Sequence, residues 1–191
     1  MIPVTVVVGN PKPNSRTRGV ALTATWGLCR CLAQEGVPVA PPELIDLTEV
    51  SAELVGHGAR ADVLEEMLRT VGVPGGLLVV ASPTFKSSYS GLLKIFIDLL
   101  PRGGLHGVVA VPLMTAASPS AQDVVEHLLR PLLLELGADV PAPGLCVMEG
   151  EFGVVQERLD KWFATVVPGL SDALRASVSC RPPQRSSAVV G

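Results

Sequence analysis

The sequence predicts one α/β domain in which a five-stranded parallel sheet lies between two layers of helices. Five short apolar runs alternate along the chain with segments of helical periodicity, and this alternation is typical of parallel sheets. The runs are continuously apolar, as expected for strands that are buried on both faces. Of the 191 residues, 48% are hydrophobic and only 17% are charged, which suits a sheet that is covered on both sides.

The expected strands are short and rich in valine or leucine. They comprise residues 3–8, 43–47, 77–81, 108–114 and 144–148. Pro41 and Pro42 precede the second run, a glycine-rich turn over residues 103–107 precedes the fourth, and Gly144 opens the fifth. Prolines and glycines at such positions mark the turns between strands and helices.

The expected helices lie between the strands. They comprise residues 16–34, 60–71, 89–100, 121–136 and 151–176. Gly36, Pro74 and Pro101 follow the first three of these segments, as is typical of helix ends.

Two prolines fall inside expected helices. The ring of Pro131 clashes with the carbonyl of His127 in the fourth helix, so a kink or a π-bulge is expected there. Pro168 is expected to break the fifth helix. Residues 177–191 contain two consecutive prolines and several serines without periodicity. We expect them to form a disordered tail after a domain of residues 1–176.

Charge and cysteine usage exclude several classes of function. The net charge is −3, so the chain lacks the basic field that nucleic acids and anionic membranes attract. No run approaches the roughly 20 apolar residues of a membrane span, and the first nine residues lack the basic flank of a signal peptide. Cys29, Cys31, Cys146 and Cys180 form neither a zinc pattern nor a C-x-x-C motif. We therefore expect a cytoplasmic protein with reduced cysteines and no metal, nucleic-acid or membrane partner.

The loop after the first strand has the character of a phosphate site. It opens the first helix, whose start offers free backbone N–H groups and the positive end of the helix dipole. The candidate ligands are Asn10, Lys12, Asn14, Ser15, Arg16 and Thr17. The spacing fits neither the dinucleotide motif G-x-G-x-x-G nor a P-loop. The alternative interpretation is an ordinary N-capped helix with polar turn residues.

The loops after the third and fourth strands have features of a site for a flat polar ring. Parallel strands end at one edge of the sheet, so these loops are expected to lie beside the first. The candidates are Pro83, Thr84, Phe85, Lys86, Ser87, Ser88, Thr115, Ala116, Ala117 and Ser118. The earlier loop supplies backbone donors and an aromatic surface, and the later one leaves room for a ring. Gly91 is expected to allow close approach of the next helix. The alternative for the earlier loop is a helix cap with Phe85 as a packing residue.

In these loops the sequence resembles the NAD(P)H-dependent FMN reductases, a flavodoxin-like family. Their phosphate loop, roughly G-S-P-R-x-x-S-R-T, is similar to residues 9–17. Their ring loop, roughly T-P-x-Y-K-x-x-Y-S-G-x-L-K-x-x-x-D-L-L-P, is similar to residues 82–101. Their third loop, P-L-A-T-G-G, is similar to residues 112–117. More narrowly, the chain resembles the subgroup that supplies reduced flavin to alkanesulfonate-type monooxygenases.

The resemblance implies a flavodoxin-like three-layer sandwich that binds FMN and reduces it with NADPH or NADH. The residues implied to hold the FMN phosphate are Asn10, Lys12, Ser15 and Thr17, and those implied to hold the isoalloxazine ring are 83–88 and 115–118. Hydride transfer is the chemistry of the two cofactors, so no catalytic acid or base is implied. Three departures, Asn10, Lys12 and Phe85, keep a donor, a charge and an aromatic ring. Ala116 and Ala117 replace a glycine pair and add methyl groups near the expected ring.

Two other functions remain open. One is a quinone, azo-dye or metal-ion reductase that retains its FMN, and the other is a flavodoxin-type electron carrier. Lys12, Arg16 and the small net charge speak against the carrier, because such carriers are strongly acidic. Arg16 or Arg18 could meet the 2′-phosphate of NADPH, but the sequence does not choose between NADPH and NADH.

The expected helix over residues 89–100 is apolar on nearly every side from residue 92 onward, which predicts contact with the sheet on one side and with a second subunit on the other. The alternative is a core helix of the monomer. In the subgroup that the chain resembles, an extra residue at the place of His127 forms a π-bulge at a subunit contact. We therefore hypothesise that His127 contributes to the interface of a homodimer or homotetramer. A plain proline kink with an exposed His127 is the alternative. The resemblance also implies a flavin-dependent monooxygenase as partner.

Overall fold

Five parallel strands form one sheet in the order β2-β1-β3-β4-β5. The computed structural model describes residues 1–56, 61–118 and 123–179. The strands are β1 (Val4–Val8), β2 (Glu43–Asp46), β3 (Leu77–Pro83), β4 (Val109–Ala116) and β5 (Leu145–Met148). Every pairing between neighbouring strands is parallel. The predicted α/β fold with a five-stranded parallel sheet is therefore confirmed.

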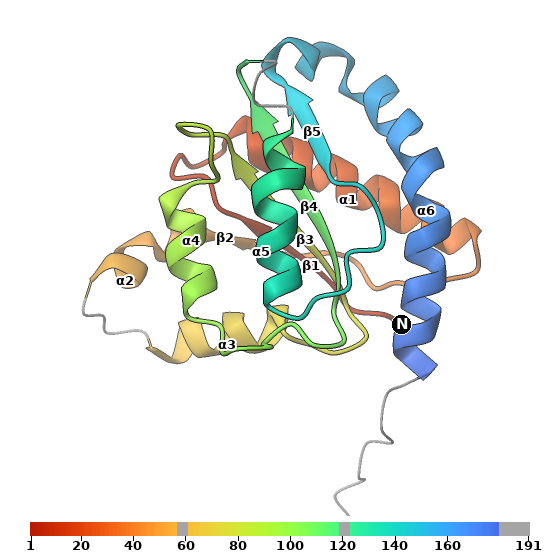
Figure 1. The fold of residues 1–191 in the computed structure, drawn as a ribbon, viewed down its shortest axis with the longest axis horizontal. Coiled ribbons are helices and arrows are strands. Elements are labelled where there is room, and N and C mark those ends of the chain that lie inside the picture. Colours follow the sequence, from red (N-terminus) through yellow and green to blue (C-terminus); the bar gives the residue numbers. More distant parts are fainter. Residues whose placement is uncertain (57–60, 119–122, 180–191) are drawn as a thin grey trace, which may run out of the picture.

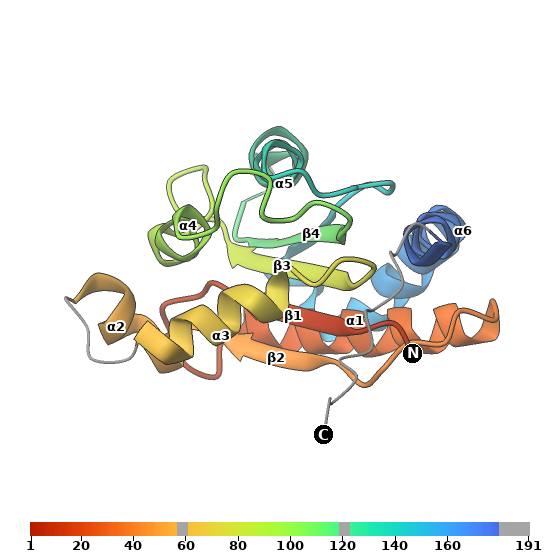
Figure 2. The same cartoon turned by 90° about the horizontal axis from the view of Figure 1, so that it is seen from below.

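Helices cover both faces of the sheet. The helices are α1 (Arg16–Gln34), α2 (Ser51–Val55), α3 (Ala61–Val71), α4 (Gly91–Asp98), α5 (Arg130–Glu135) and α6 (Val155–Ser179). Helices α1 and α6 pack on one face, and α3, α4 and α5 pack on the other (Figures 1 and 2). Strand residues alternate between the two apolar cores, as Val6 and Val7 show.

The strands β3 and β4 extend two residues beyond their predicted ends. Pro83 pairs with Thr115 at the last step of their ladder. The extension continues both strands into the loops that were expected to bind a ring. The residues at this edge are therefore held by sheet pairing rather than by loop contacts.

Helix α1 begins and ends where the sequence predicts. The side chain of Ser15 caps it by accepting a hydrogen bond from the backbone N–H of Arg18. Gly36 follows the helix with a φ of 76°, a left-handed conformation that favours glycine. At Gly27 a Cβ would overlap the ring of Phe163, so α1 and α6 pack closely at this point.

The predicted distortion at Pro131 is confirmed. A π-helical turn, η3 (Val125–Leu129), precedes α5, in which Pro131 lies at the start. The N–H of Arg130 donates to the carbonyl of Val125, five residues back. The proline lacks an N–H and is crowded by the preceding turn, and the wider turn relieves this conflict.

The predicted break at Pro168 is wrong, because α6 runs through this residue from Val155 to Ser179. Val166, Val167 and Leu170 are buried on either side of the proline, and this packing holds the helix together despite the missing hydrogen bond. The helix also includes residues 177–179, which were expected to belong to a disordered tail. The rest of that segment lies outside the described residues.

Three further short segments differ from the prediction. Residues 149–154 form a 3₁₀ helix, η4 (Glu149–Val154), rather than the first turn of α6. A 3₁₀ turn, η1 (Leu47–Val50), and helix α2 follow β2. Leu47 was predicted to end the second strand, and no element was predicted over residues 48–55. The side chain of Asp46 starts η1 by accepting a hydrogen bond from the N–H of Thr48 at 3.1 Å. This local polar cap gives no periodic pattern in the sequence.

Candidate functional site

A cleft of about 620 Å³ opens at the carboxyl ends of β1, β3 and β4. Its lining residues are Asn10, Lys12, Pro13, Asn14, Ser15, Arg16, Thr17, Pro83, Thr84, Phe85, Thr115, Ala117, Glu149 and Phe152. This edge is where open parallel sheets bind ligands, because the strand order reverses beside β1. The cleft thus joins the three loops that the sequence singled out.

The structure brings most of the predicted site residues together, but not all of them. Every candidate of the first loop lines the cleft, whereas Lys86, Ser87, Ser88, Ala116 and Ser118 are not among its lining residues. Lys86 and Ser87 form an exposed turn. Ala116 is 2% exposed and pairs with β5 in the sheet. Its methyl group therefore lies in the core rather than on the cleft surface.

The first loop is fixed by the side chain of Asn10. This side chain is 7% exposed, and its Oδ1 accepts a hydrogen bond from the N–H of Lys12 at 3.0 Å. Asn14, with a φ of 50°, turns the chain into α1. The first backbone N–H groups of a helix have no intrahelical acceptors. In α1, the N–H of Arg18 donates to the hydroxyl of Ser15. The cleft therefore faces the donor end of α1, with the exposed cations of Lys12 and Arg16 beside it.

The second loop contains a tight hairpin that presents Phe85. Phe85 and Ser88 exchange both backbone hydrogen bonds, at 2.8 and 3.0 Å. Lys86 and Ser87 between them have φ values of 50° and 57°, the combination of a type I′ turn. Phe85 is 44% exposed at the cleft. The backbone donor of Ser88 is used inside the hairpin, so it is not free for a ring.

Ser90 joins the first two loops beneath the cleft. Its side chain is 1% exposed and donates to the carbonyl of Gly9. Its N–H donates to the hydroxyl of Ser82 at 2.9 Å. A Cβ on Gly9 would lie 2.5 Å from the Cβ of Leu93, whereas a Cβ on Gly91 would meet nothing within 4 Å. The expected role of Gly91 is therefore wrong, and Gly9 is the glycine that allows α4 to approach.

Three residues that line the cleft were not among the predicted site residues, namely Pro13 of the first loop, Glu149 and Phe152. Glu149 and Phe152 come from η4, which directly follows β5. The guanidinium carbon of Arg16 lies 5.5 Å from the centroid of the Phe152 ring, within cation–π range. The sequence signal for Glu149 and Phe152 was their position alone. They follow the fifth strand, whose carboxyl end lies at the same edge of the sheet as those of the other strands.

The two arginines near the start of α1 differ in their partners. Arg18 Nε lies 3.3 Å from the carboxylate of Asp46, which is 5% exposed. Arg18 is not among the residues that line the cleft, whereas Arg16 is. Arg16 is therefore the arginine of this pair that is placed to meet a bound anion.

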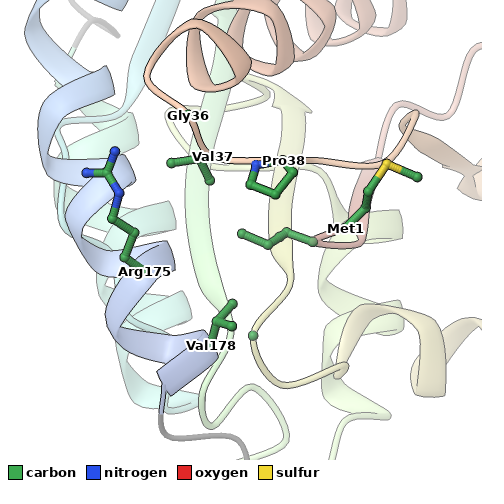
Figure 3. Close-up of a pocket in the computed structure, with 8 residues that line it drawn as sticks. Met1, Gly36, Val37, Pro38, Arg175 and Val178 are labelled. Carbon is green, nitrogen blue, oxygen red and sulfur yellow. The ribbon is translucent and has the colours of Figure 1, made fainter.

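A smaller cavity lies at the opposite edge of the sheet, before β1 and β3. It measures about 170 Å³, and its lining includes Met1, Val37, Pro38, Arg175 and Val178 (Figure 3). Arg175 already donates to the backbone carbonyl of Glu35 at 2.6 Å. This cavity is mostly apolar and lacks the convergent donors of the larger cleft.

The buried cysteines Cys29 and Cys146 are not placed to act as nucleophiles. Burial raises the pKa of the Cys29 and Cys146 thiols to about 11, so both stay protonated near neutral pH.

Within residues 1–56, 61–118 and 123–179, no group of three or more metal-ligating side chains gathers. No helix in the same part of the chain is long and apolar enough to cross a membrane.

Comparison with known proteins gives a consistent pattern. The sequence profile of the NADPH-dependent FMN reductase family matches residues 2–152. An FMN reductase (NADPH) of Pseudomonas aeruginosa is 31% identical over 154 residues, or 78% of each chain. An FMN reductase (NADPH) of Escherichia coli is 43% identical over 61 residues. The E. coli alignment spans only 32% of each chain.

A solved structure extends the similarity to nearly the whole chain. The apo form of an NADH:FMN oxidoreductase superposes with a TM-score of 0.71 and 27% sequence identity. The superposition covers 95% of this chain and 92% of the other. The similarity therefore includes α6, which lies beyond the residues that the family profile matches.

Proposed function

The chain belongs to the NADPH-dependent FMN reductase family, and from this premise we propose that it binds FMN in the cleft at the start of α1 and reduces it with a nicotinamide cofactor. The observation that carries the proposal is the composition of this cleft. It combines a helix start and two cations on one side with an aromatic side chain on the other. A phosphate ester joined to a flat ring needs these two environments in one site.

The donor end of α1 supports the placement of the FMN phosphate. Free N–H groups and the helix dipole favour an anion there. Lys12 and Arg16 add positive charge. The buried Asn10 fixes the loop, so little ordering is required when the phosphate binds.

The edge formed by β3 and β4 supports the placement of the isoalloxazine ring. Pro83, Phe85 and Ala117 offer apolar surface beside the polar groups of Thr84 and Thr115. The hydroxyl of Thr84 is buried and has no hydrogen-bond partner within the described residues. An unpaired buried hydroxyl is unusual in a native structure, and a polar ring edge bound beside Thr84 is a candidate partner for it.

When bound, the two cofactors supply the hydride chemistry themselves. The role of the chain is then to bind and orient them. Of the two arginines near the start of α1, Arg16 is placed to meet the nicotinamide nucleotide or the flavin phosphate, whereas Arg18 is paired with Asp46. The similar proteins are named for NADPH and for NADH, so the preference of this chain has to be measured.

We propose that the reduced flavin is released to a flavin-dependent monooxygenase in the cytoplasm. The rim of the cleft supports exchange, since Lys12, Arg16 and Phe85 are exposed. A flavin held at such a rim can leave without the opening of a buried chamber. An FMN-retaining reductase would be expected to enclose the ring more completely.

We further propose that the chain self-associates through the outer surface of α4, η3 and α5. Leu99, Leu128 and Leu134 are 45%, 37% and 47% exposed on this side. His127 lies on the same surface and its Nδ1 is 2.8 Å from the carbonyl oxygen of Asp123. Exposed large apolar side chains on these elements favour a subunit contact. Sedimentation of the wild type and of His127→Ala tests both the assembly and the role of this histidine.

Steady-state oxidation of NADPH and NADH, each with FMN or FAD, tests the enzymatic proposal. We expect turnover that depends on added FMN and a protein that is colourless after purification. A protein that stays yellow and reduces quinones without added flavin would instead indicate an FMN-retaining reductase. If neither nicotinamide is oxidised above background, the result would favour a flavodoxin-type electron carrier instead of a reductase.

A further inference from the structure

The residues of the cleft are joined by a chain of buried hydrogen bonds that crosses from one side to the other. Asn10 Nδ2 donates to the hydroxyl of Thr17 at 3.0 Å. The hydroxyls of Thr17 and Thr115 lie 2.7 Å apart. Thr17 and Thr115 are 98 residues apart in the sequence, so this contact is one of the links that tie the start of α1 to the end of β4.

Thr115 also contacts the second loop. Its backbone carbonyl accepts a hydrogen bond from the N–H of Thr84 at 2.7 Å. Thr115 is therefore bonded to Thr17 at the start of α1 through its side chain and to the loop of Thr84 through its main chain. It is the residue at which the phosphate side and the ring side of the cleft meet.

The three side chains in this chain of bonds are buried. Asn10, Thr17 and Thr115 are 7%, 2% and 6% exposed. Their hydroxyl and amide groups already have partners inside the protein. The polar side-chain atoms of these residues are therefore engaged in hydrogen bonds inside the protein. A ligand in the cleft would contact mainly their backbone atoms.

We propose that Thr115 is a positioning residue that sets the phosphate loop against the ring-binding edge through its hydroxyl contact with Thr17. Loss of the Thr115 hydroxyl leaves the buried Thr17 hydroxyl with one partner fewer. Thr17 anchors Asn10, and Asn10 anchors the N–H of Lys12, so the disturbance reaches the cationic loop. A ligand with both a ring and a phosphate needs both sides in register, whereas a ligand with the ring alone does not.

This inference rests on the proposed binding of FMN, and riboflavin separates the two. Riboflavin has the same ring and lacks the phosphate. The dissociation constant of riboflavin divided by that of FMN therefore measures how much the phosphate contributes to binding. We expect Thr115→Val to reduce this ratio about five- to tenfold, the effect of losing one buried hydrogen bond. We expect Thr115→Ser, which keeps the hydroxyl, to retain the wild-type ratio within about twofold.

The pair of threonines allows a test of coupling. Thr17→Val also removes the acceptor of Asn10, so it should reduce the ratio at least as much as Thr115→Val. If the two threonines act through each other, the double variant should reduce the ratio no further than Thr17→Val alone. Thr25→Val is the matched control. Thr25 is a buried threonine of α1 that donates to the carbonyl of Ala21 at 2.7 Å, outside the cleft. It should leave the ratio unchanged, and thermal unfolding should show that every variant is folded.

Three results would overturn the inference. Equal weakening of FMN and riboflavin by Thr115→Val would indicate a role at the ring alone. Multiplying effects in the double variant would show that the two threonines act independently. A wild-type chain that binds neither flavin would instead overturn the proposed function, and the inference with it.

Discussion

The two loops that face each other across the cleft are held in place in different ways. The loop of residues 9–17, which is the proposed phosphate loop, depends on contacts with other elements, since the carbonyl of Gly9 accepts from Ser90 and Asn10 bonds to Thr17. The hairpin of residues 85–88 depends on its own two backbone hydrogen bonds and a two-residue turn. A change beneath the phosphate loop should therefore spread through the protein, whereas a change in the hairpin should stay local.

The largest expected effect comes from filling the space above Gly9. In Gly9→Ala the new methyl group would lie 2.5 Å from the Cβ of Leu93. We expect the free energy of unfolding to fall by about 1–3 kcal/mol, as for overpacked sites. Urea denaturation measures this, and Gly91→Ala is the control because its methyl would meet nothing within 4 Å. Similar losses in both variants would contradict the close approach at Gly9.

The next effect concerns charge on the phosphate loop. We expect Lys12→Gln to weaken FMN roughly tenfold, the contribution of a charge-assisted hydrogen bond, and to leave riboflavin unchanged. Fluorescence titrations at low and high salt measure both constants. Lys161→Gln removes the same charge from the exposed surface of α6 and should have no effect. An equal loss for riboflavin would show that Lys12 does not meet the phosphate.

A change in the hairpin should affect FMN and riboflavin equally, unlike a change at Lys12. We expect Phe85→Ala to weaken FMN and riboflavin alike by about fivefold, since an aromatic contact contributes about 1 kcal/mol. The same titrations serve here. Trp26→Ala removes another exposed aromatic side chain, 55% exposed on α1 outside the cleft, and should change neither constant. A loss confined to FMN would place Phe85 near the phosphate instead.

The smallest effect tests the local nature of the hairpin. Ser87 has a φ of 57°, which costs about 1–2 kcal/mol for a residue with a Cβ. We expect Ser87→Gly to raise the free energy of unfolding by about 0.5 kcal/mol after the entropic cost of glycine. Ser88→Gly, at a position without a positive φ, should lower it by about 0.5–1 kcal/mol. Destabilisation by both variants would show that the turn stores no strain.

The sequence predicts the parts of this fold that depend on local patterns. The five apolar runs and the bounds of α1 follow from periodicity and capping. The π-helical turn follows from the covalent geometry of Pro131. Pro168 shows the limit, because burial of the neighbouring residues of α6 outweighs the local preference of proline.

The cleft shows the same division. Every predicted residue of the first loop lines the cleft, because these residues surround the start of one helix. Phe152 was not predicted, since its place beside Arg16 depends on how η4 leaves β5. The hairpin residues Lys86 and Ser87 look like ring donors in the sequence. In the structure their left-handed backbone makes them the exposed tip of the turn. The sequence does not indicate this turn, because neither residue is a glycine.

The close packing of Gly27 against Phe163 has a consequence for biosynthesis. Helix α1 and helix α6 together form one layer on the sheet, yet more than a hundred residues are synthesised between them. While a ribosome completes the later strands, the side of α1 that packs against α6 at Gly27 has no cover. The nascent chain therefore passes through a stage with an adhesive apolar surface, and synthesis that stops before residue 155 would leave that surface bare.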